Sequence, residues 1–281
     1  MELNLIDKVT QRLVYAFYIK DNIDSFDNDK SYKIHFACLR KIFSYTLYDE
    51  AIFIISADDL NNSLIKELMF KLSNICITVK NIRYVIEKNN PDHREGPIFE
   101  KHILNKLNDY DGITLYFHNK SCQPTYSLTY NENNPDITYW IIGQYYFNMY
   151  VSKEWLSSFI KNDNKLIYGW PYMHDNWHTQ WLIGGSCYWM KCPDIYKYIT
   201  KNNIKNNYIL SRCISEYYFP EILSKEQVDY PLSNIIKDTI YIHKYYEPSI
   251  EASFIDYLQN TLTYNAYVNF MKFYNDIMEE V

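Results

Sequence analysis

The sequence predicts an α/β protein with a mixed, mainly parallel sheet flanked by helices and a helical C-terminal appendage. Three observations predict this class. Four short runs rich in β-branched and aromatic residues alternate with segments of helical periodicity over the first 118 residues. These runs are apolar throughout, as strands buried on both faces are. The remainder of the chain contains further short apolar runs and then sequence with mostly helical periodicity.

The first four strands are expected where the apolar runs RLVYAFYI, AIFIIS, ICITVKNI and GITLYF occur, at residues 12–19, 51–56, 75–82 and 112–117. Helical spacing of apolar residues predicts the intervening helices at residues 31–45, at residues 61–74 and from Pro97, a proline suited to a first helical position. The order β-α-β-α-β-α-β is typical of a parallel sheet covered by helices.

The second half has a polar loop, then a long aromatic helical stretch from Trp140 to Phe159. A strand is expected near residues 165–169, a second within 181–191, and a helix at 193–202. From residue 226 the sequence has mostly helical periodicity, and it shows no boundary signal of an independent domain. We therefore expect one α/β domain over residues 1–225 and a helical extension over 226–281 that packs on the same core.

Composition narrows the classes of partner and compartment. The net charge is −6 and no long block of Lys or Arg occurs, so nucleic acid is not expected as a partner. The six Cys lack the spacing of a disulfide framework, a pattern that suits reduced, buried thiols. The N-terminus lacks the features of a signal peptide, and no uncharged apolar run of about 18 residues occurs. These features predict a cytoplasmic protein without a transmembrane segment.

Several nucleotide and hydrolase motifs are missing. No GxGxxG follows the first strand, no GxxxxGK[ST] occurs, and no GxSxG elbow is found. These absences disfavour hydride transfer, NTP hydrolysis and the hydrolase version of the architecture.

Polar residues follow three of the four predicted strands. In parallel sheets, ligands bind at the carboxyl ends of the strands, so these positions are candidates for a binding site. The residues in question are Lys20 after the first strand, Asp58 and Asp59 after the second, and His118, Asn119 and Lys120 after the fourth. The alternative for His118 is a satisfied histidine that holds the loop in place.

A zinc site is the less favoured interpretation of His174, His178, Cys187 and Cys192, because the two Cys are five apart in a strand-like run and would point to opposite faces. Glu216, in the aromatic segment SEYYFPEIL, is either a carboxylate whose pKa is raised for general base work or a solvated residue near a helix start.

The paired glycines Gly184 and Gly185 interrupt a bulky strand. They indicate either close approach of a ligand or a bulge that bends the strand.

The succession LYFHNKS, IYGWPYMH, GGSCYWMK and RCISEYYFPEI resembles a family of small glycosyltransferases found in bacterial polysaccharide loci and large DNA viruses. That family is similar to the GT-A fold, a Rossmann-like architecture of nucleotide-sugar enzymes. Its strand ending in His-Thr-Lys-Gly resembles residues 118–121, and its Arg followed by Glu resembles Arg212 and Glu216. The resemblance covers roughly residues 12–223.

The chain departs from the family at two points. Asn119 and Ser121 stand where Thr and Gly are usual. His-Asn-Lys also follows the fourth strand, where most GT-A enzymes carry an Asp-x-Asp that holds a divalent metal. A Mn²⁺ or Mg²⁺ ion is therefore left open, with His118 as its candidate ligand.

The resemblance implies a nucleotide-sugar donor, with uridine as the commonest base for the fold. Lys120 and Arg94 become candidates for neutralising the diphosphate, aided by the N–H groups at the start of the Pro97 helix. His118 and the Gly184–Gly185 pair would contact the phosphates or the sugar. Tyr18, Lys20 and either Asp58 or Asp59 would recognise the nucleoside.

On the acceptor side, the resemblance implies that the aromatic loop GWPYMHDNWH packs against sugar rings of a glycan, through Trp170, Tyr172, Trp177 and His178. Core packing is the alternative in so aromatic a chain. Glu216 is the leading general base, with Asp175 second.

Two competing interpretations stay open. A non-catalytic nucleotide-sugar or carbohydrate-binding module on the same fold would bind without turnover. Another nucleotide-dependent transferase would bind sugar nucleotides no better than plain nucleoside diphosphates.

Overall fold

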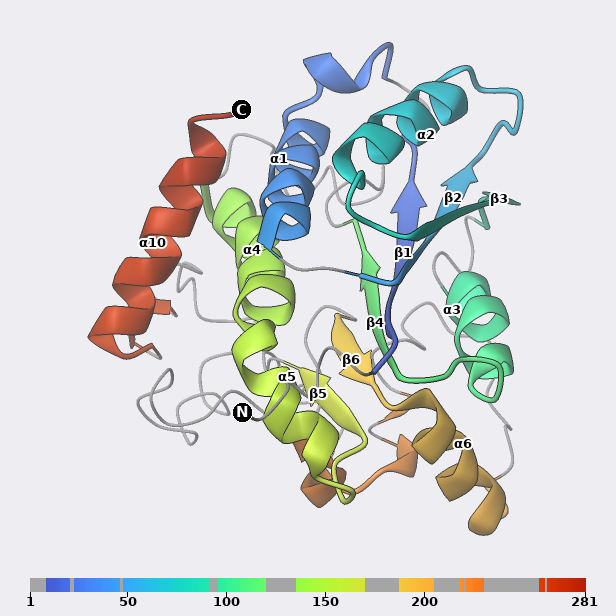
Figure 1. Ribbon diagram of the computed structural model, residues 1–281. Coiled ribbons are helices and arrows are strands. Elements are labelled where there is room, and N and C mark those ends of the chain that lie inside the picture. Colours follow the sequence, from blue (N-terminus) through green and yellow to red (C-terminus); the bar gives the residue numbers. More distant parts are fainter. Residues whose placement is uncertain are drawn as a thin grey trace, which may run out of the picture.

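The computed structural model describes residues 9–20, 23–45, 48–90, 96–119, 135–169, 187–204, 218–219, 221–229, 258–260 and 262–281. Within these residues the chain forms a seven-stranded sheet in the order β3-β2-β1-β4-β6-β5-β7 (Figure 1). The strands are β1 (Gln11–Tyr18), β2 (Glu50–Ala57), β3 (Asn81–Lys88), β4 (Ile113–His118), β5 (Ile167–Gly169), β6 (Tyr188–Met190) and β7 (Val228–Asp229).

The sheet is mixed and mainly parallel, as the sequence predicts. Strands β3, β2, β1 and β4 are parallel neighbours, whereas β6 runs antiparallel to both β4 and β5. The last strand, β7, pairs in parallel with β5.

Helices cover both faces of the sheet (Figure 1). One face packs against α1 (Lys30–Tyr45), α2 (Leu64–Ile75), α4 (Pro135–Tyr145), α5 (Ser152–Lys161) and α10 (Tyr264–Met278), and the other against α3 (Gly96–His102) and α6 (Cys192–Lys201). Short 3₁₀ turns are η2 (Phe26–Asn28), η3 (Leu104–Lys106) and η7 (Lys225–Gln227), and η5 (Tyr146–Tyr150) is a π-helical turn.

The pattern of β1 explains why its sequence is apolar without interruption. Leu13, Tyr15 and Phe17 belong to the core beneath α1 and α4, while Val14 and Ala16 belong to the core beneath α3. Successive side chains of a strand point to opposite faces, so a strand covered on both sides must be apolar at every position.

The third strand lies six residues later than the apolar run predicted. Residues 75–82 were expected to form it, but α2 continues to Ile75, a turn follows, and β3 spans Asn81–Lys88. As an edge strand, β3 is partly exposed along its whole length and can carry Arg83, Glu87 and Lys88. The prediction failed because it looked for a strand buried on both faces.

The second half follows the predicted order of elements. The stretch from Trp140 to Phe159 is helical but passes through the π turn η5, and the predicted helix at 193–202 is α6. Helix α10 packs its Phe270 and Phe273 into the same core as α1 and α4. The division of the chain at residue 225 stays a prediction, while β7, just beyond it, joins the main sheet.

The four Cys of the described part, Cys38, Cys76, Cys187 and Cys192, are buried, as expected, and none of them forms a disulfide. Burial raises the pKa of Cys192 to about 12, so this thiol does not ionise near neutral pH. None of the helices that the structure describes has the length and apolarity needed to span a bilayer.

Candidate functional site

The candidate site lies at the carboxyl ends of β1, β2, β3 and β4. The chain proceeds from β1 outward to β2 and β3, and then crosses to the other side of β1 to form β4. The direction of strand succession therefore reverses between β1 and β4. Open α/β sheets bind ligands at such a reversal, beyond the carboxyl ends of the strands.

Asn119 links the two strands at this reversal. The β1–β4 ladder ends at the pair Ala16 and His118, and the Asn119 N–H donates to the Ala16 carbonyl at 3.1 Å. The Asn119 side chain then replaces the next rung. Its Oδ1 accepts from the Tyr18 N–H at 2.7 Å and its Nδ2 donates to the Tyr18 carbonyl at 3.0 Å. Asn119 is 3% exposed, so this amide is part of the framework of the site.

Lys20 is held by an acidic partner that the sequence analysis did not identify. Its ammonium lies 2.9 Å from Asp29 Oδ2, and the two side chains are 8% and 9% exposed. The other oxygen of Asp29 accepts from the N–H groups of Ser31 and Tyr32, which begin α1. The Tyr32 hydroxyl in turn donates to the Tyr18 carbonyl and accepts from the Lys20 N–H. Lys20 therefore fixes the start of α1 against the end of β1.

A short polar row crosses the ends of β1, β2 and β3. The Tyr18 hydroxyl donates to Asp58 Oδ2 at 3.4 Å, and Asn89 Nδ2 donates to Asp58 Oδ1 at 2.8 Å. The Asp58 carboxylate is partly exposed. Carboxylate oxygens accept hydrogen bonds from N–H and O–H groups, so the partly exposed Asp58 is a candidate acceptor for a ligand.

Asp59, the neighbour of Asp58, has a local role in the loop before α2. It is exposed, its Oδ1 accepts from the Asn61 N–H at 2.9 Å, and its carbonyl accepts from the Asn62 N–H. These bonds are those of an Asx turn. Of the two candidate carboxylates after β2, Asp58 is the one that meets residues of the neighbouring strands.

His118 ends β4 and is 6% exposed. Its ring lies 6.4 Å from that of Tyr116, with 28° between the planes, on the same face of the strand. The imidazole therefore belongs to the face of the sheet that α3 and α6 cover. Among the residues that the structure describes, no group of three or more His, Cys, Asp or Glu side chains could hold a metal ion.

Glu87 and α3 meet beside this edge. Glu87 Oε1 lies 2.6 Å from Lys101 Nζ and 3.0 Å from His102 Nε2. Burial would raise the pKa of Glu87, but the hydrogen bonds from these two side chains outweigh it and lower the pKa. For His102, burial lowers the pKa, and this effect is larger than the rise caused by its hydrogen bond to Glu87, so the pKa is lowered overall. A neutral His102 that donates a hydrogen bond from Nε2 to Glu87 is consistent with the lowered pKa of both residues.

Behind the site, a buried polar cluster joins β1 to α1 and α4. The Tyr15 and Tyr145 hydroxyls are 2.6 Å apart, and the Tyr145 hydroxyl is 2.7 Å from His35 Nδ1. All three side chains are fully buried. The π turn η5 follows directly after Tyr145, and within it the Asn148 carbonyl accepts from Trp189 Nε1 at 2.8 Å. The cluster fixes how α4 leaves the sheet.

The opposite edge of the sheet carries charges that neutralise one another. Arg12 pairs with Glu50 and Asp111, Arg83 also pairs with Glu50, and Lys80 pairs with Asp49. Burial would lower the pKa of Arg12, but hydrogen bonds to the two carboxylates raise it, so it remains charged. These side chains sit at the amino ends of β1, β2 and β3, away from the candidate site.

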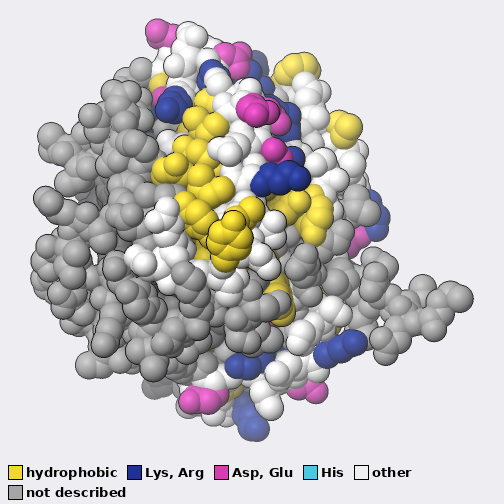
Figure 2. Space-filling view, turned by 90° about the vertical axis from the view of Figure 1, so that its left-hand side faces the viewer, with side chains coloured by type: hydrophobic (Ala, Val, Ile, Leu, Met, Phe, Trp, Pro, Cys, Tyr) yellow, Lys and Arg dark blue, Asp and Glu magenta, His cyan; other side chains and the backbone are white. Residues whose placement is uncertain are grey.

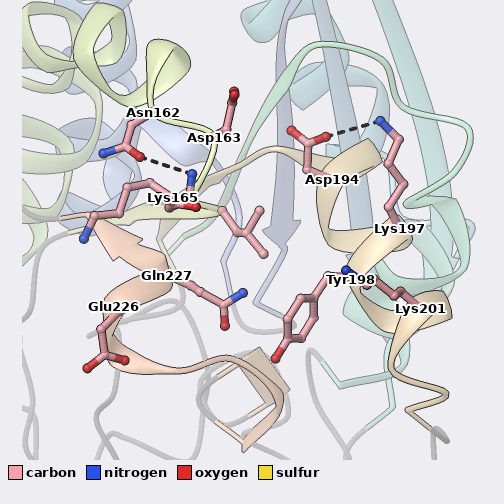
Figure 3. A pocket seen from close by; sticks show the side chains of 11 residues that line it. Asn162, Asp163, Lys165, Asp194, Lys197, Tyr198, Lys201, Glu226 and Gln227 are labelled. Carbon is pink, nitrogen blue, oxygen red and sulfur yellow. Dashed lines mark hydrogen bonds and ion pairs between the residues drawn. The ribbon is translucent and has the colours of Figure 1, made fainter.

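A groove of about 770 Å³ also opens at the amino end of β5, between the turn before that strand and α6 (Figure 3). Tyr198 and Gln227 lie across it from each other (Figure 3). Three of its charged side chains contact groups of the protein: Lys197 pairs with Asp194, and Lys165 Nζ donates to the Val228 carbonyl. It contains none of the side chains that the sequence singled out, and it lies at the opposite edge from Asp58 and Asn119.

The structure thus brings Tyr18, Asp58 and Asn119 together, with Lys20 and His118 on the same edge. Asn89 was missed because the third strand was placed too early in the sequence; a polar residue after a strand is the same signal that identified Asp58. The remaining candidates lie outside the described residues, namely Arg94, Lys120, Asp175, His178, Gly184, Gly185 and Glu216.

Comparison with known proteins does not identify a family for the chain. No family model and no curated protein matches the chain. Among solved structures, the chain is similar to 4-diphosphocytidyl-2C-methyl-D-erythritol synthase from Anaerococcus prevotii, with a TM-score of 0.41 and 11% sequence identity over 85% of this chain and 97% of that one. A likeness this distant identifies neither the ligand nor the activity of the chain.

Proposed function

We propose that the chain is a glycosyltransferase that moves a sugar from a nucleotide-sugar donor, with uridine as the expected base, to a hydroxyl group of a glycan or another acceptor. The supporting observation is the meeting of polar side chains from four strand ends at the point where the strand order reverses. The motif resemblance over residues 12–223 supplies the class of reaction.

The nucleoside would bind against Tyr18 and Asp58. The Asp58 carboxylate can accept from an N–H of the base or a ribose hydroxyl, and Asn89 and Tyr18 orient it through their hydrogen bonds. Tyr18 is only 5% exposed, so a bound base would meet the edge of its ring rather than stack on the ring face. Asn119 and Lys20 support this pocket by holding β4 and α1 in register with β1.

In the proposed reaction the acceptor oxygen forms a bond to the anomeric carbon, and the bond from that carbon to the diphosphate breaks. The general base, Glu216 with Asp175 as second candidate, takes the hydroxyl proton. Lys120 and Arg94 stabilise the departing diphosphate, and His118 and the Gly184–Gly185 pair contact it or the sugar. His178 contributes to the acceptor side. Bound Mn²⁺ or Mg²⁺ would share the charge of the diphosphate.

The first experiment is thermal unfolding of the whole chain with a panel of nucleosides, nucleoside diphosphates and nucleotide sugars, each with EDTA and with Mn²⁺. A ligand at 100 times its Kd stabilises the folded state by about 2.7 kcal/mol. We expect a selective rise in the unfolding temperature with one sugar nucleotide. If this rise persists in EDTA, cationic side chains rather than a metal ion bind the diphosphate. No shift with any sugar nucleotide, with or without metal, would refute the proposal.

Variants locate the ligand and separate binding from turnover. Asp58→Asn is expected to weaken donor binding at least tenfold, whereas Asp109→Asn, at an exposed carboxylate that pairs with Lys106, serves as the matched control. Glu216→Gln is expected to keep the donor shift and lose sugar transfer. Binding without turnover in the unmodified chain, over a panel of acceptors, would instead identify a non-catalytic nucleotide-sugar module.

The cytoplasm is the proposed compartment, where nucleotide sugars are made and thiols stay reduced. The proposed partners are the nucleotide sugar and a glycan acceptor. Fractionation of cells that express the tagged chain tests the location directly.

A further inference from the structure

The groove at the amino end of β5 differs in chemistry from the side of the molecule on which α10 lies. Figure 2 shows a band of hydrophobic side chains on the α10 side. The groove, by contrast, is lined mostly by polar and charged side chains, and its volume of about 770 Å³ is that of a small-molecule site. Its walls come from the turn between α5 and β5, from α6 and from η7 (Figure 3). The groove therefore suits a ligand that forms hydrogen bonds.

The walls of the groove are joined to one another by hydrogen bonds. The buried Lys191, at the end of β6, donates from Nζ to the Asn162 carbonyl at 2.7 Å, and the same carbonyl accepts from the Lys165 N–H at 3.0 Å. The Leu166 N–H donates to the Gln227 carbonyl at 2.8 Å, which joins the turn before β5 to η7. A site whose walls are already fixed loses less conformational freedom when it binds a ligand.

Tyr198 and Gln227 meet across the groove. Tyr198 extends from α6, and the Gln227 side chain reaches from η7 toward it (Figure 3). Gln227 Oε1 accepts from the Ser224 N–H at 2.8 Å, so the amide is oriented with its Nε2 on the side of Tyr198. Within the described part of the chain, neither Gln227 Nε2 nor the Tyr198 hydroxyl has a hydrogen-bond partner. Both groups are therefore available to a ligand, and Leu166 adds apolar surface to the same lining.

The charges around the groove balance. Its lining contains three basic and three acidic side chains, namely Lys165, Lys197, Lys201, Asp163, Asp194 and Glu226. At the lower end of the molecule, where α5 and α6 lie in Figure 1, Figure 2 likewise shows side chains of both charges. A site for a phosphate or a nucleotide concentrates Lys and Arg, so that the field attracts the anion. The balance at this groove instead favours a ligand without net charge.

Hydroxyl groups match the mixture of donors and acceptors in this lining. A phosphate oxygen only accepts and an ammonium only donates, whereas a hydroxyl can accept from Gln227 Nε2 and donate to the Tyr198 oxygen or to a carboxylate. A sugar ring also has a face of C–H groups, which can pack against an aromatic side chain such as Tyr198. A neutral sugar therefore combines the properties that the lining requires.

We propose that the groove at the amino end of β5 is a carbohydrate-binding site, in which Tyr198 and Gln227 hold a neutral oligosaccharide. The site is separate from the residues at the carboxyl ends of β1, β2 and β4. The proposal goes beyond the proposed sugar transfer and does not depend on it, because binding in the groove requires neither a nucleotide sugar nor turnover.

Titration of the full chain with neutral hexasaccharides of glucose, mannose, galactose, xylose and N-acetylglucosamine, without nucleotide, tests the proposal. We expect at least one of them to bind with a Kd on the order of 1 mM and to shift the side-chain NH₂ signals of Gln227 in ¹H–¹⁵N spectra. Gln227→Glu keeps an acceptor for the Ser224 N–H and removes the NH₂ group, and Tyr198→Ala removes the ring. Each variant should weaken binding at least tenfold.

Tyr196→Ala is the matched control for Tyr198→Ala. Tyr196 lies on the same helix, is 41% exposed and is outside the lining, so this variant should bind like the unmodified chain. Thermal unfolding shows whether each variant is folded, and the Gln227 signals of the unmodified chain give a readout that needs no variant.

Three results would overturn the proposal. The first is no binding of any hexasaccharide at about ten times the expected Kd. The second is binding that leaves the Gln227 signals unshifted and that the folded groove variants do not weaken, because the oligosaccharide would then lie elsewhere on the chain. The third is a shift of the Gln227 signals by inorganic phosphate alone, which would identify an anion site.

Discussion

The ion pair between Lys20 and Asp29 allows a quantitative test of how the site is built. Both side chains are almost fully buried, their charged atoms are 2.9 Å apart, and the Lys20 ammonium lies 5.7 Å from the centre of the Tyr32 ring. The informative change is Asp29→Asn. Asparagine caps a helix as well as aspartate does, so the N–H groups of Ser31 and Tyr32 keep an acceptor. The negative charge and the carboxylate oxygen to which Lys20 donates are lost.

The expected loss follows from the buried ammonium that remains. Removing one member of a buried ion pair typically costs about 3–5 kcal/mol. Neutralising a lysine of ordinary pKa near 10.4 at pH 7 costs about 4.6 kcal/mol, which sets a ceiling, since the ammonium can lose its proton instead. The Tyr32 ring retains roughly 1 kcal/mol of attraction. We therefore expect a loss of about 3 kcal/mol, or a fall in Tm of about 6–12 °C.

Three further variants complete the measurement by urea and thermal unfolding. Lys20→Met should lose less than Asp29→Asn, because Asp29 keeps its bonds to the start of α1. The double variant Lys20→Met with Asp29→Asn should recover at least 1 kcal/mol relative to Asp29→Asn alone, since no unpaired charge remains. Asp29→Ala should lose about 1 kcal/mol more than Asp29→Asn, through the missing cap.

A loss below about 1 kcal/mol in Asp29→Asn, or no recovery in the double variant, would refute the assignment of Lys20 to the framework. It would instead indicate an ammonium that remains available to water or to a ligand. The same variants therefore distinguish the two roles that the sequence leaves to Lys20. Donor binding by Lys20→Met, measured where the variant is folded, gives the second readout.

Three other predictions concern single positions. Asn119→Ala should cost about 1–3 kcal/mol in urea unfolding, because the buried Tyr18 N–H loses its acceptor; an unchanged midpoint would contradict the rung assigned to Asn119. Gly112→Ala should lower the free energy of unfolding by about 2–4 kcal/mol, since φ is +65° and a Cβ would lie 2.1 Å from the Thr10 carbonyl oxygen. The control Asp111→Asn changes the neighbouring, largely exposed residue and should cost under about 1 kcal/mol. His102, whose pKa is lowered in the folded state, binds fewer protons there than when unfolded, so stability should fall as pH drops below about 6.5. The pKa of Glu87 is also lowered, so the free energy of unfolding should fall further below about pH 4.5. His102→Gln should remove only the loss of stability near pH 6. An unaltered profile of unfolding free energy against pH would contradict this account.

The sequence predicts those elements whose burial leaves an uninterrupted apolar run or a helical periodicity. Strands β1, β2 and β4 are covered on both faces, so their apolar runs locate them within a residue or two. Helices α1 and α6 follow from periodicity. The edge strand β3 was missed because an edge tolerates charge, while the apolar run ICITV ends α2 and forms the following turn.

The polar residues at the strand ends were predictable in position, and their contacts within the fold much less so. The rule that ligands bind where strands end selected Lys20, Asp58 and Asn119 from the sequence alone, whereas Tyr18 was named from the motif resemblance. It could not show that Asp29, nine residues from Lys20, would be its partner, because that contact depends on how the loop before α1 folds back. The role of Asn89 depends in the same way on the register of β3 with β2.

The identity of residue 119 shows how the framework and the site constrain each other. Beyond Ala16 and His118 the two strands no longer pair, yet the Tyr18 N–H and carbonyl at this position are buried and need partners. An asparagine side chain carries an acceptor and a donor in the geometry of a peptide group, so it can serve both at once. The asparagine at residue 119 is therefore explained by the end of the β1–β4 ladder, and the chemistry proposed for this strand end falls to His118 and Lys120.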